Sequence, residues 1–166
     1  MRLLSGVIGR KPMIAVCGGG EADAETMRLA SEVGRELAAR GALVISGGLG
    51  GVMTACCQGA HEAGGLTVGI VPGTNTSVAN PDVDIAIASG MAEGRNVLIV
   101  HSADAIIALK GAYGTLSEIS LGLAMRKPVA VVGDWCPIPG VVLFETPREA
   151  AAHAVAATVR AGGQRA

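Results

Sequence analysis

The sequence predicts one α/β domain with a Rossmann-like, doubly wound fold: a mostly parallel sheet with helices on both faces. Short apolar runs rich in β-branched residues alternate with segments whose apolar residues recur at helical spacing. Because the runs are apolar on both faces, they are typical of parallel strands that are covered on both sides. The length of 166 residues fits a single domain, which we expect at residues 12–166 after an N-terminal tail at residues 1–11.

In the first half of the chain, two helices are expected to alternate with four strands. Ala30, Val33 and Leu37 recur at helical spacing, and Gly41 marks the end of that helix. A second helix is expected at residues 52–63. The expected strands are residues 13–17, 42–46, 66–71 and 83–88.

The second half continues in the same way. Helices are expected at residues 95–102 and 115–125, and the latter ends before Pro128. A final helix follows Thr146, which we expect to be its N-cap, with Pro147 at the first helical position. The expected strands are residues 105–109, 129–132 and, with a weaker pattern, 141–144.

The composition argues against nucleic-acid and membrane partners. The net charge is −1 and aromatic residues make up 2% of the chain, so both a basic footprint and a base-stacking platform are missing. No apolar run reaches the roughly 18 residues that a membrane span needs, and we expect a cytoplasmic protein. Charged residues are only 16% of the chain, which suggests that a homodimer or homotetramer covers part of the surface.

The cysteines and histidines predict no metal site. Cys17, Cys56, Cys57 and Cys136 include no CxxC pair, and the three histidines fall in no zinc pattern. Free cysteine is among the most buried residue types. We therefore interpret these residues as small buried thiols that contribute to packing.

Glycine follows nearly every expected strand. In doubly wound sheets, ligands bind outside the carboxyl ends of the strands. There, missing Cβ atoms let backbone N–H groups approach an anion, and helix N-termini add partial positive charge. A tight turn requires glycine even without a ligand, but such loops at four strand ends favour a phosphate-bearing ligand. The candidate binding residues of these loops are Gly18, Gly19, Gly20, Gly47, Gly48, Gly50, Gly51, Pro72, Gly73, Gly111 and Gly114.

Two common phosphate-binding classes are disfavoured. The glycines at residues 18–20 are followed by Glu21, Ala22 and Asp23, so the third glycine of a GxGxxG fingerprint is missing. The chain also contains no GxxxxGK[ST] motif. These absences argue against a dinucleotide cofactor and against a P-loop nucleotide hydrolase.

Three segments carry a resemblance to a known family. They are residues 46–53 (SGGLGGVM), 90–96 (GMAEGRN) and 111–118 (GAYGTLSE). Together they resemble the LOG superfamily, whose signatures are GGGxxGxM and PGGxGTxxE with an upstream arginine. The short chain, the Gly90-Met91 pair and the opening CGGGEA at residues 17–22 are most similar to its molybdenum cofactor carrier-like branch. The resemblance spans roughly residues 12–133.

The resemblance implies two functions. LOG enzymes hydrolyse the N-glycosidic bond of nucleoside 5'-monophosphates, and their motif arginine and glutamate match Arg95 and Glu118. A guanidinium can hold a phosphate bidentately, while a carboxylate stabilises an oxocarbenium ion or activates water. Carrier-like members instead hold the molybdenum cofactor, a pterin with a phosphate tail, as cargo and need no chemistry from these positions. The resemblance therefore implies no required cofactor. The motifs also bring Met53, Tyr113 and Thr115 into the candidate site. We expect a binding or carrier protein for a phosphorylated heterocycle, with a phosphoribohydrolase as the alternative.

The chain departs from the enzyme pattern in the phosphate loop and around the arginine. Lys110 stands in place of proline, and Ala112 in place of the second glycine. The enzyme motif MHxRK becomes MAEGRN here, so the histidine is lost, Arg95 lies one residue farther from the methionine, and Asn96 replaces lysine. These changes favour the carrier over the hydrolase.

The two central groups also have structural interpretations. Thr115 and Glu118 have the spacing of a capping box. Arg95 has Glu93 and Asp104 as candidate ion-pair partners. Other candidates stay open as well: Lys110 as a solvated strand end or a phosphate contact, Met53 as core or ligand contact, and Tyr113 as a cover for a heterocycle or part of a subunit interface.

Overall fold

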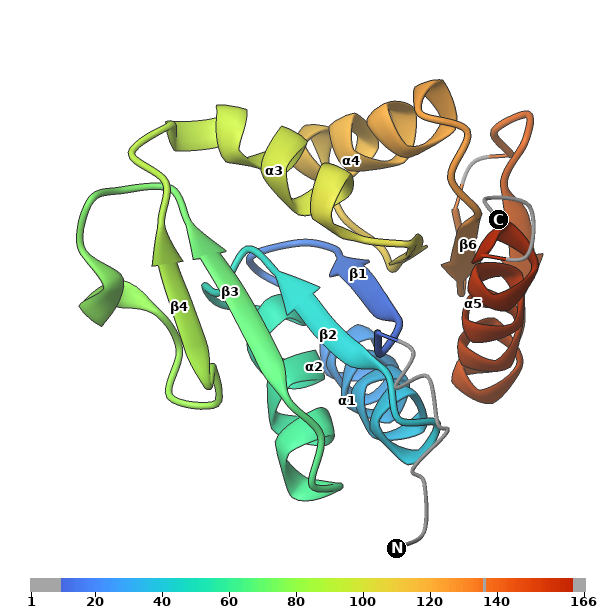
Figure 1. The fold of residues 1–166 in the computed structure, drawn as a ribbon, viewed down its shortest axis with the longest axis horizontal. Coiled ribbons are helices and arrows are strands. Elements are labelled where there is room, and N and C mark those ends of the chain that lie inside the picture. Colours follow the sequence, from blue (N-terminus) through green and yellow to red (C-terminus); the bar gives the residue numbers. More distant parts are fainter. Residues whose placement is uncertain (1–9, 136, 163–166) are drawn as a thin grey trace, which may run out of the picture.

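The computed structural model describes residues 10–135 and 137–162, which form a three-layer α/β domain (Figure 1). In the described residues, seven strands form one sheet in the order β4-β3-β2-β1-β5-β6-β7, and every neighbouring pair is parallel. The strands are β1 (Met13–Cys17), β2 (Leu43–Ser46), β3 (Thr67–Val71), β4 (Ile85–Ala88), β5 (Ala105–Ala108), β6 (Val129–Val132) and β7 (Val142–Phe144). The predicted Rossmann-like fold is confirmed.

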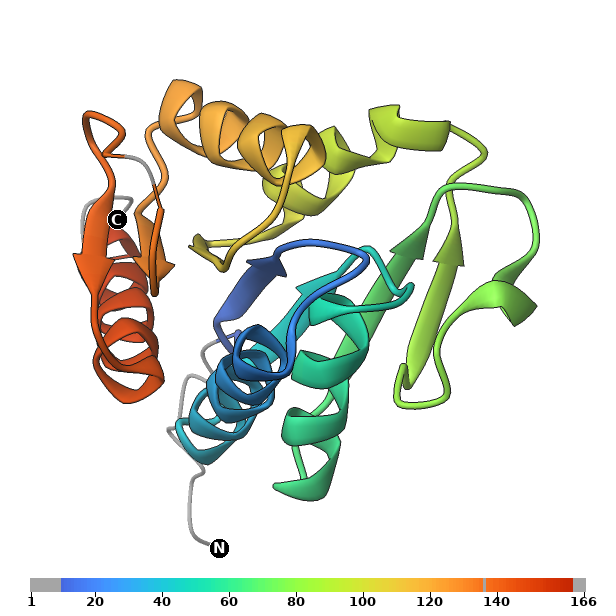
Figure 2. The same cartoon turned by 180° about the vertical axis from the view of Figure 1, so that it is seen from behind.

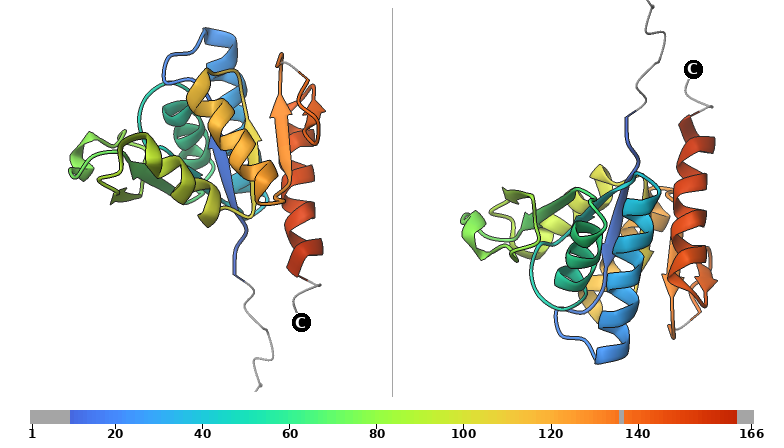
Figure 3. Two further views of the ribbon diagram at one scale, coloured as in Figure 1. Left: turned by 90° about the horizontal axis from the view of Figure 1, so that it is seen from above. Right: turned by 90° about the horizontal axis from the view of Figure 1, so that it is seen from below.

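Helices cover both faces of the sheet. Seen from above, α3 and α4 lie in front of the strands, whereas α1 and α2 lie in front when the molecule is seen from below (Figure 3). Each layer buries its own core cluster against the sheet, which is why the strands are apolar on both faces. The helices are α1 (Ala24–Ala39), α2 (Val52–Glu62), α3 (Arg95–Ser102), α4 (Tyr113–Ala124) and α5 (Pro147–Gly162), with short 3₁₀ turns η1 (Thr76–Val78) and η2 (Ala92–Gly94).

The helices α1 and α2 run side by side at very close range (Figure 2). A Cβ on Gly34 would lie 2.0 Å from the carbonyl oxygen of Cys56, and one on Gly59 would lie 1.9 Å from that of Ser31. These glycines therefore let the two backbones touch. Cys17, Cys56 and Cys57 are buried free thiols, as predicted.

Most predicted elements are confirmed, with shifts of one or two residues at their ends. Thr146 Oγ1 accepts a hydrogen bond from the Glu149 N–H at 3.3 Å, and Pro147 opens the final helix, as expected. The capping box that the spacing of Thr115 and Glu118 allowed as an alternative does not form. Because α4 begins at Tyr113, Thr115 lies inside the helix and cannot cap it. Residues 1–9 of the expected tail, Cys136 and residues 163–166 lie outside the described residues.

The order of the strands creates a switch point between β1 and β5. The chain adds β2, β3 and β4 to one side of β1, and then crosses back through α3 to place β5 on the other side. The loops after β1 and β5 consequently run in opposite directions. In doubly wound sheets such a divergence opens a crevice at the carboxyl edge.

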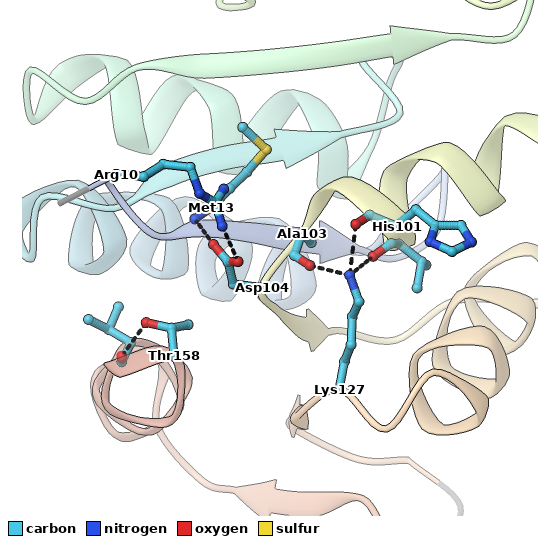
Figure 4. A network of polar contacts seen from close by, with 9 residues as sticks. Arg10, Met13, His101, Ala103, Asp104, Lys127 and Thr158 are labelled. Carbon is cyan, nitrogen blue, oxygen red and sulfur yellow. Dashed lines mark hydrogen bonds and ion pairs between the residues drawn. The ribbon is translucent and has the colours of Figure 1, made fainter. Parts of the chain in front are cut away.

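The opposite edge of the sheet anchors α3 through a polar network (Figure 4). Lys127 Nζ donates to the carbonyl oxygens of Val100 (2.6 Å), His101 (2.8 Å) and Ala103 at the end of α3. A lysine ammonium at a helix C-terminus is favourable because the terminal carbonyls carry partial negative charge. The network leaves the N-terminal end of α3, with Arg95, directed toward the carboxyl edge.

Asp104 belongs to the same network rather than to the candidate site. Its carboxylate accepts a hydrogen bond from the Met13 N–H at 2.9 Å and pairs with Arg10. Asp104 therefore pairs with residues at the opposite edge of the sheet. The ion pair with Arg95 that the sequence allowed does not form.

Two findings bear on membranes and metals. Among the described residues, no helix is both long and apolar enough to cross a membrane. The described part of the chain also contains no group of three or more histidine, cysteine or acidic residues that could hold a metal ion.

Candidate functional site

A cavity of about 260 Å³ lies at the switch point, where the loops after β1, β2, β3 and β5 converge. Many of the residues singled out from the sequence line it: Gly18, Gly19, Gly20, Gly47, Met53, Pro72, Arg95, Gly114, Thr115 and Glu118. Segments from four separate loops and three helices therefore meet in one cavity, as expected for the carboxyl edge of such a sheet.

Other candidate residues lie outside the wall of the cavity. Gly48, Gly50, Gly51 and Gly73 shape the loops behind it, and Gly111 lines a neighbouring hollow. Tyr113 is 89% exposed and lies on a groove between α3 and α4. It does not cover the cavity in this structure.

Sequence reasoning missed several lining residues: Val16, Cys17, Leu49, Ala92, Glu93, Asn96 and Ala112. Most of them adjoin the glycine motifs, so their position in the chain was the available signal. Asn96 also joins two helices, because its Nδ2 donates to Ser117 Oγ at 3.0 Å.

The helices that start at the cavity lack side-chain caps. The N-caps of α2 and α4 are Gly51 and Ala112, and neither provides a side-chain hydrogen bond. By contrast, α1 is capped by Asp23, which accepts from the Thr26 N–H at 2.8 Å, and α5 is capped by Thr146. Open helix N-termini present N–H donors and partial positive charge to an anion.

Arg95 supplies a cation to the same space. It opens α3, and its guanidinium packs against Gly47 so closely that a Cβ there would lie 2.0 Å from Nη1. Among the described residues, Arg95 Nε is the buried side-chain nitrogen or oxygen that has no hydrogen-bond partner. Burial lowers the pKa of Arg95, while the charges of Glu118 and Glu93 oppose that shift. A desolvated donor without a partner favours an anionic ligand.

Glu118 faces this cation from α4. The residue is only 8% exposed. Burial raises its pKa to about 7, although Arg95 and a hydrogen bond with the Cys17 thiol pull the value down. Burial and the carboxylate of Glu118 raise the pKa of Cys17 in turn, so this residue remains a thiol. A carboxyl group with a pKa near neutrality can exchange a proton at physiological pH.

The glycines of the site fall into two groups. A Cβ on Gly18 would lie 2.6 Å from Val52, and one on Gly111 would lie 2.1 Å from Thr115 Oγ1, so these glycines serve the packing. At Gly20 and Gly114 an added Cβ would meet no atom within 4 Å, and neither residue has a left-handed backbone. The packing of the chain therefore does not explain these two glycines, both of which line the cavity.

Part of the remaining wall is apolar, although Glu93, Asn96 and Thr115 also line the cavity. Val16, Leu49, Met53, Pro72 and Ala92 line the cavity beside the charged pair. Apolar walls with a few polar groups are typical of small-molecule sites. The combination suits a flat ring next to a phosphate.

Comparisons with known proteins agree with this geometry. The model of a family described as SLOG cluster4 matches residues 11–161. The chain is a member of the SLOG cluster4 family. This assignment confirms the resemblance to the LOG superfamily that the glycine motifs indicated.

Relatives of this SLOG protein include named enzymes. It is 32% identical over 145 residues to the cytokinin riboside 5'-monophosphate phosphoribohydrolase of Mycobacterium tuberculosis, covering 81% of this chain and 77% of the enzyme. It is 46% identical over 147 residues to an uncharacterized protein of Archaeoglobus fulgidus, covering 89% of this chain and 97% of that protein.

Similar solved structures carry a different name. The molybdenum cofactor binding protein of Rippkaea orientalis matches with a TM-score of 0.84 and 35% identity, covering 91% of this chain and 99% of that one. The molybdenum cofactor carrier protein of Chlamydomonas reinhardtii matches with a TM-score of 0.80 and 30% identity, covering 91% and 99%. The SLOG protein thus resembles both functional classes that the sequence indicated.

Proposed function

We propose that this SLOG cluster4 protein binds and carries a phosphorylated heterocycle in the cavity at the switch point. The observation that carries the proposal is the buried, unpartnered Nε of Arg95 beside the uncapped starts of α2 and α4. The phosphate binds the guanidinium and the N–H groups at the start of α4. The ring lies against the apolar wall that includes Met53 and Pro72.

The molybdenum cofactor has both of the required parts, a pterin ring and a phosphate. Its role as cargo is supported by the names of the similar structures from Rippkaea orientalis and Chlamydomonas reinhardtii. The departures from the enzyme motif at Lys110, Ala112 and Asn96 agree with carriage.

Ligand binding tests the proposal directly. The purified protein is examined for co-purifying pterin by absorbance and fluorescence. Its melting temperature is then recorded with nucleoside 5'-monophosphates and with pterin phosphates. We expect a rise in melting temperature with a phosphorylated heterocycle and none with the dephosphorylated form. If no phosphorylated heterocycle raises the melting temperature, the proposal is wrong.

A second candidate function is hydrolysis of a nucleoside 5'-monophosphate, supported by the position of Glu118. This carboxyl group has a pKa of about 7 and shares the cavity with Arg95. In this reaction water adds to the anomeric carbon, the bond to the base breaks, and the base leaves with a proton. Glu118 would stabilise the oxocarbenium-like transition state or accept the proton from water.

Chromatography for free base separates the two functions. Release of base by the wild type that is lost in Glu118→Gln would establish the hydrolase. A protein that binds the monophosphates and releases no base acts as a carrier. Lys11→Ala, a substitution outside the cavity, serves as the matched control for preparation effects.

We also propose that a second copy of the chain covers the outer face of α3 and α4, giving a homodimer or a dimer of dimers. Val97, Leu98, Tyr113 and Leu116 are large exposed apolar residues of these helices, and a groove of about 750 Å³ runs between the two helices. Light scattering should report an oligomer for the wild type and a monomer for Leu116→Glu. A monomeric wild type would contradict this assignment.

A further inference from the structure

The ionisable side chains of the cavity are poorly balanced for an anionic ligand. Among the described residues, those that line it are Arg95, Glu93, Glu118 and Cys17. When Glu118 is ionised, one guanidinium faces two carboxylates, so these side chains are net negative. A phosphate monoester is largely a dianion at neutral pH, because its second pKa is about 6. Its binding in this cavity would bring three negatively charged groups together around one cation.

The groups next to the cavity do not supply the missing positive charge. The neighbouring polar hollow adds the carboxylates of Glu21 and Asp23 and the ammonium of Lys110, whose Nζ lies 3.2 Å from Asp23 Oδ2. The open start of α4 contributes the equivalent of only about half an elementary charge. A group inside the cavity that gives up its negative charge when the ligand enters would restore the balance.

Glu118 is the carboxyl group best placed to give up its charge. It is buried, whereas Glu93 is exposed. Burial raises the pKa of Glu118 to about 7, so both its neutral and its ionised form are present near neutral pH. Its neighbour Cys17 stays a neutral thiol, because burial and the Glu118 carboxylate both raise the pKa of Cys17. The change of charge therefore falls on Glu118.

A bound phosphate acts on Glu118 in one direction. Gly114, Thr115 and Glu118 all line the cavity from the first two turns of α4, at whose start we place the phosphate. A negative charge at this range disfavours the ionised form of a buried carboxyl group. The Arg95 guanidinium also stabilises the Glu118 carboxylate less once it binds the phosphate. Both effects favour the neutral carboxyl group in the complex.

We propose that this protein binds its phosphorylated ligand together with one proton, which Glu118 holds while the ligand stays in the cavity. The proton comes from the surrounding buffer and forms the O–H bond of the Glu118 carboxyl group, and no other bond changes. This inference rests on the proposed function, because it requires a phosphate in the cavity. Affinity then decreases as the pH rises above neutrality, and the ligand is released. A carboxyl group that keeps its proton cannot act as a base toward water, so this coupling also favours carriage over hydrolysis.

Titration calorimetry in buffers of different ionisation enthalpy measures this proton directly. The probes are AMP, GMP and 6-hydroxymethylpterin phosphate at pH 7.5, where the free phosphate has largely lost its second proton. The slope of binding enthalpy against buffer ionisation enthalpy gives the number of protons taken up. For the wild type we expect about half a proton or more per ligand, and about tenfold weaker binding at pH 8.5 than at pH 6.5. Glu118→Gln should show neither effect.

Glu93→Gln is the matched control for the loss of charge. It removes one carboxylate from the wall of the same cavity and keeps Glu118. We expect this variant to bind the probes more tightly than the wild type and still to take up the proton. The pair of variants therefore separates proton uptake at Glu118 from a general effect of negative charge.

The outcomes separate this inference from the proposed function. If a probe binds and the wild type takes up no proton, the inference is wrong and the proposed function stands. The inference is also wrong if Glu118→Gln takes up as many protons as the wild type, or if Glu93→Gln abolishes the uptake. Should Glu118→Gln fail to fold, the wild type and Glu93→Gln decide by the same measurement. If no probe binds, the proposed function fails and this inference fails with it.

Discussion

The helices α1 and α4 begin at neighbouring loops on either side of the switch point, yet their first turns are built differently. The N-terminus of α1 is closed by the carboxylate of Asp23, which accepts from the Thr26 N–H at 2.8 Å. The N-terminus of α4 follows Ala112 and has no side-chain cap. A capped helix start is complete within the chain, whereas an open start leaves donors for a ligand. The difference is consistent with the proposal that the ligand phosphate binds at the start of α4.

The carboxyl groups at these two helix starts, Asp23 and Glu118, also differ, because their pKa values are shifted in opposite directions. The hydrogen bonds from Thr26, followed by the interaction with Lys110, lower the pKa of Asp23 to about 2. Burial raises the pKa of Glu118 to about 7. Asp23 therefore stabilises the fold above its ordinary pKa, and this contribution is lost as the pH falls toward 2. Glu118 behaves in the opposite way and reduces stability when it ionises.

The largest expected effect is on the pH dependence of stability, which Glu118→Gln should abolish by removing the ionisable carboxyl group. The pKa of Glu118 is about 7 in the fold against an ordinary 4.5, so the unfolded chain loses the proton first. Stability is therefore full below pH 4.5 and falls as the pH rises through 7, by on the order of 3 kcal/mol at most. Urea unfolding of the ligand-free protein between pH 4.5 and 8 should show this slope in the wild type and not in Glu118→Gln. An identical slope in both proteins contradicts the assignment.

Arg95→Ala is expected to cause the next largest change, in ligand binding. Loss of a charge-assisted hydrogen bond costs about 2 kcal/mol, or about thirtyfold in affinity for the phosphorylated ligand. The free energy of unfolding should not fall, because the substitution removes a buried donor that has no partner. Calorimetry and urea unfolding measure the two effects. Arg28→Ala on α1 is the matched control, since this exposed arginine pairs with Glu25 and Glu32 of its own helix.

An N-cap side chain like that of α1 can be introduced at α4, and it should change both stability and ligand affinity. In Ala112→Asp, a carboxylate at the N-cap should raise the ligand-free stability by about 1 kcal/mol. The same negative charge would lie at the position proposed for the ligand phosphate, so affinity should fall roughly tenfold. Ala112→Asn caps without charge and should weaken binding less. Unchanged affinity in Ala112→Asp would mean that the phosphate does not bind at the start of α4.

The smallest expected effect comes from Gly114→Ala. This helical position has room for a Cβ, and alanine in place of glycine stabilises a helix by roughly 0.5–1 kcal/mol. Because Gly114 lines the cavity, we expect the added methyl group to take up part of the space proposed for the ligand, so affinity should decrease while the melting temperature rises. Gly34→Ala is the opposite control, because its Cβ would lie 2.0 Å from the Cys56 carbonyl oxygen and should lower stability. A Gly114→Ala protein with wild-type affinity contradicts the proposed ligand position.

Sequence reasoning reached the fold and many of the residues that line the cavity, because both depend on local patterns. β1 and β6 occupy the residues expected from their apolar runs, and Pro147 opens α5 where its ring is favourable. Glycine after successive parallel strands is enough to place the loops at one edge, since the carboxyl ends of parallel strands all lie there. Neither inference required a long-range contact.

Local patterns could not determine the electrostatics of the site. The spacing of Thr115 and Glu118 suits a capping box, but the helix begins two residues earlier, and the carboxyl group turns into the cavity instead. Nothing in the sequence around Arg95 indicates that its Nε is buried without a hydrogen-bond partner. The guanidinium packs against Gly47, which is distant in the chain and adjacent in space.

The sequence by itself determined the alternation of strands and helices, the glycine-rich carboxyl edge and the family, because periodicity and backbone freedom are properties of neighbouring residues. Only the tertiary structure decided which helix starts stay open, which carboxyl group has a pKa of about 7, and that a polar hollow adjoins the cavity. The physical reason is the crossover through α3. It places β5 beside β1 and thereby brings together groups whose burial and charge no local pattern records.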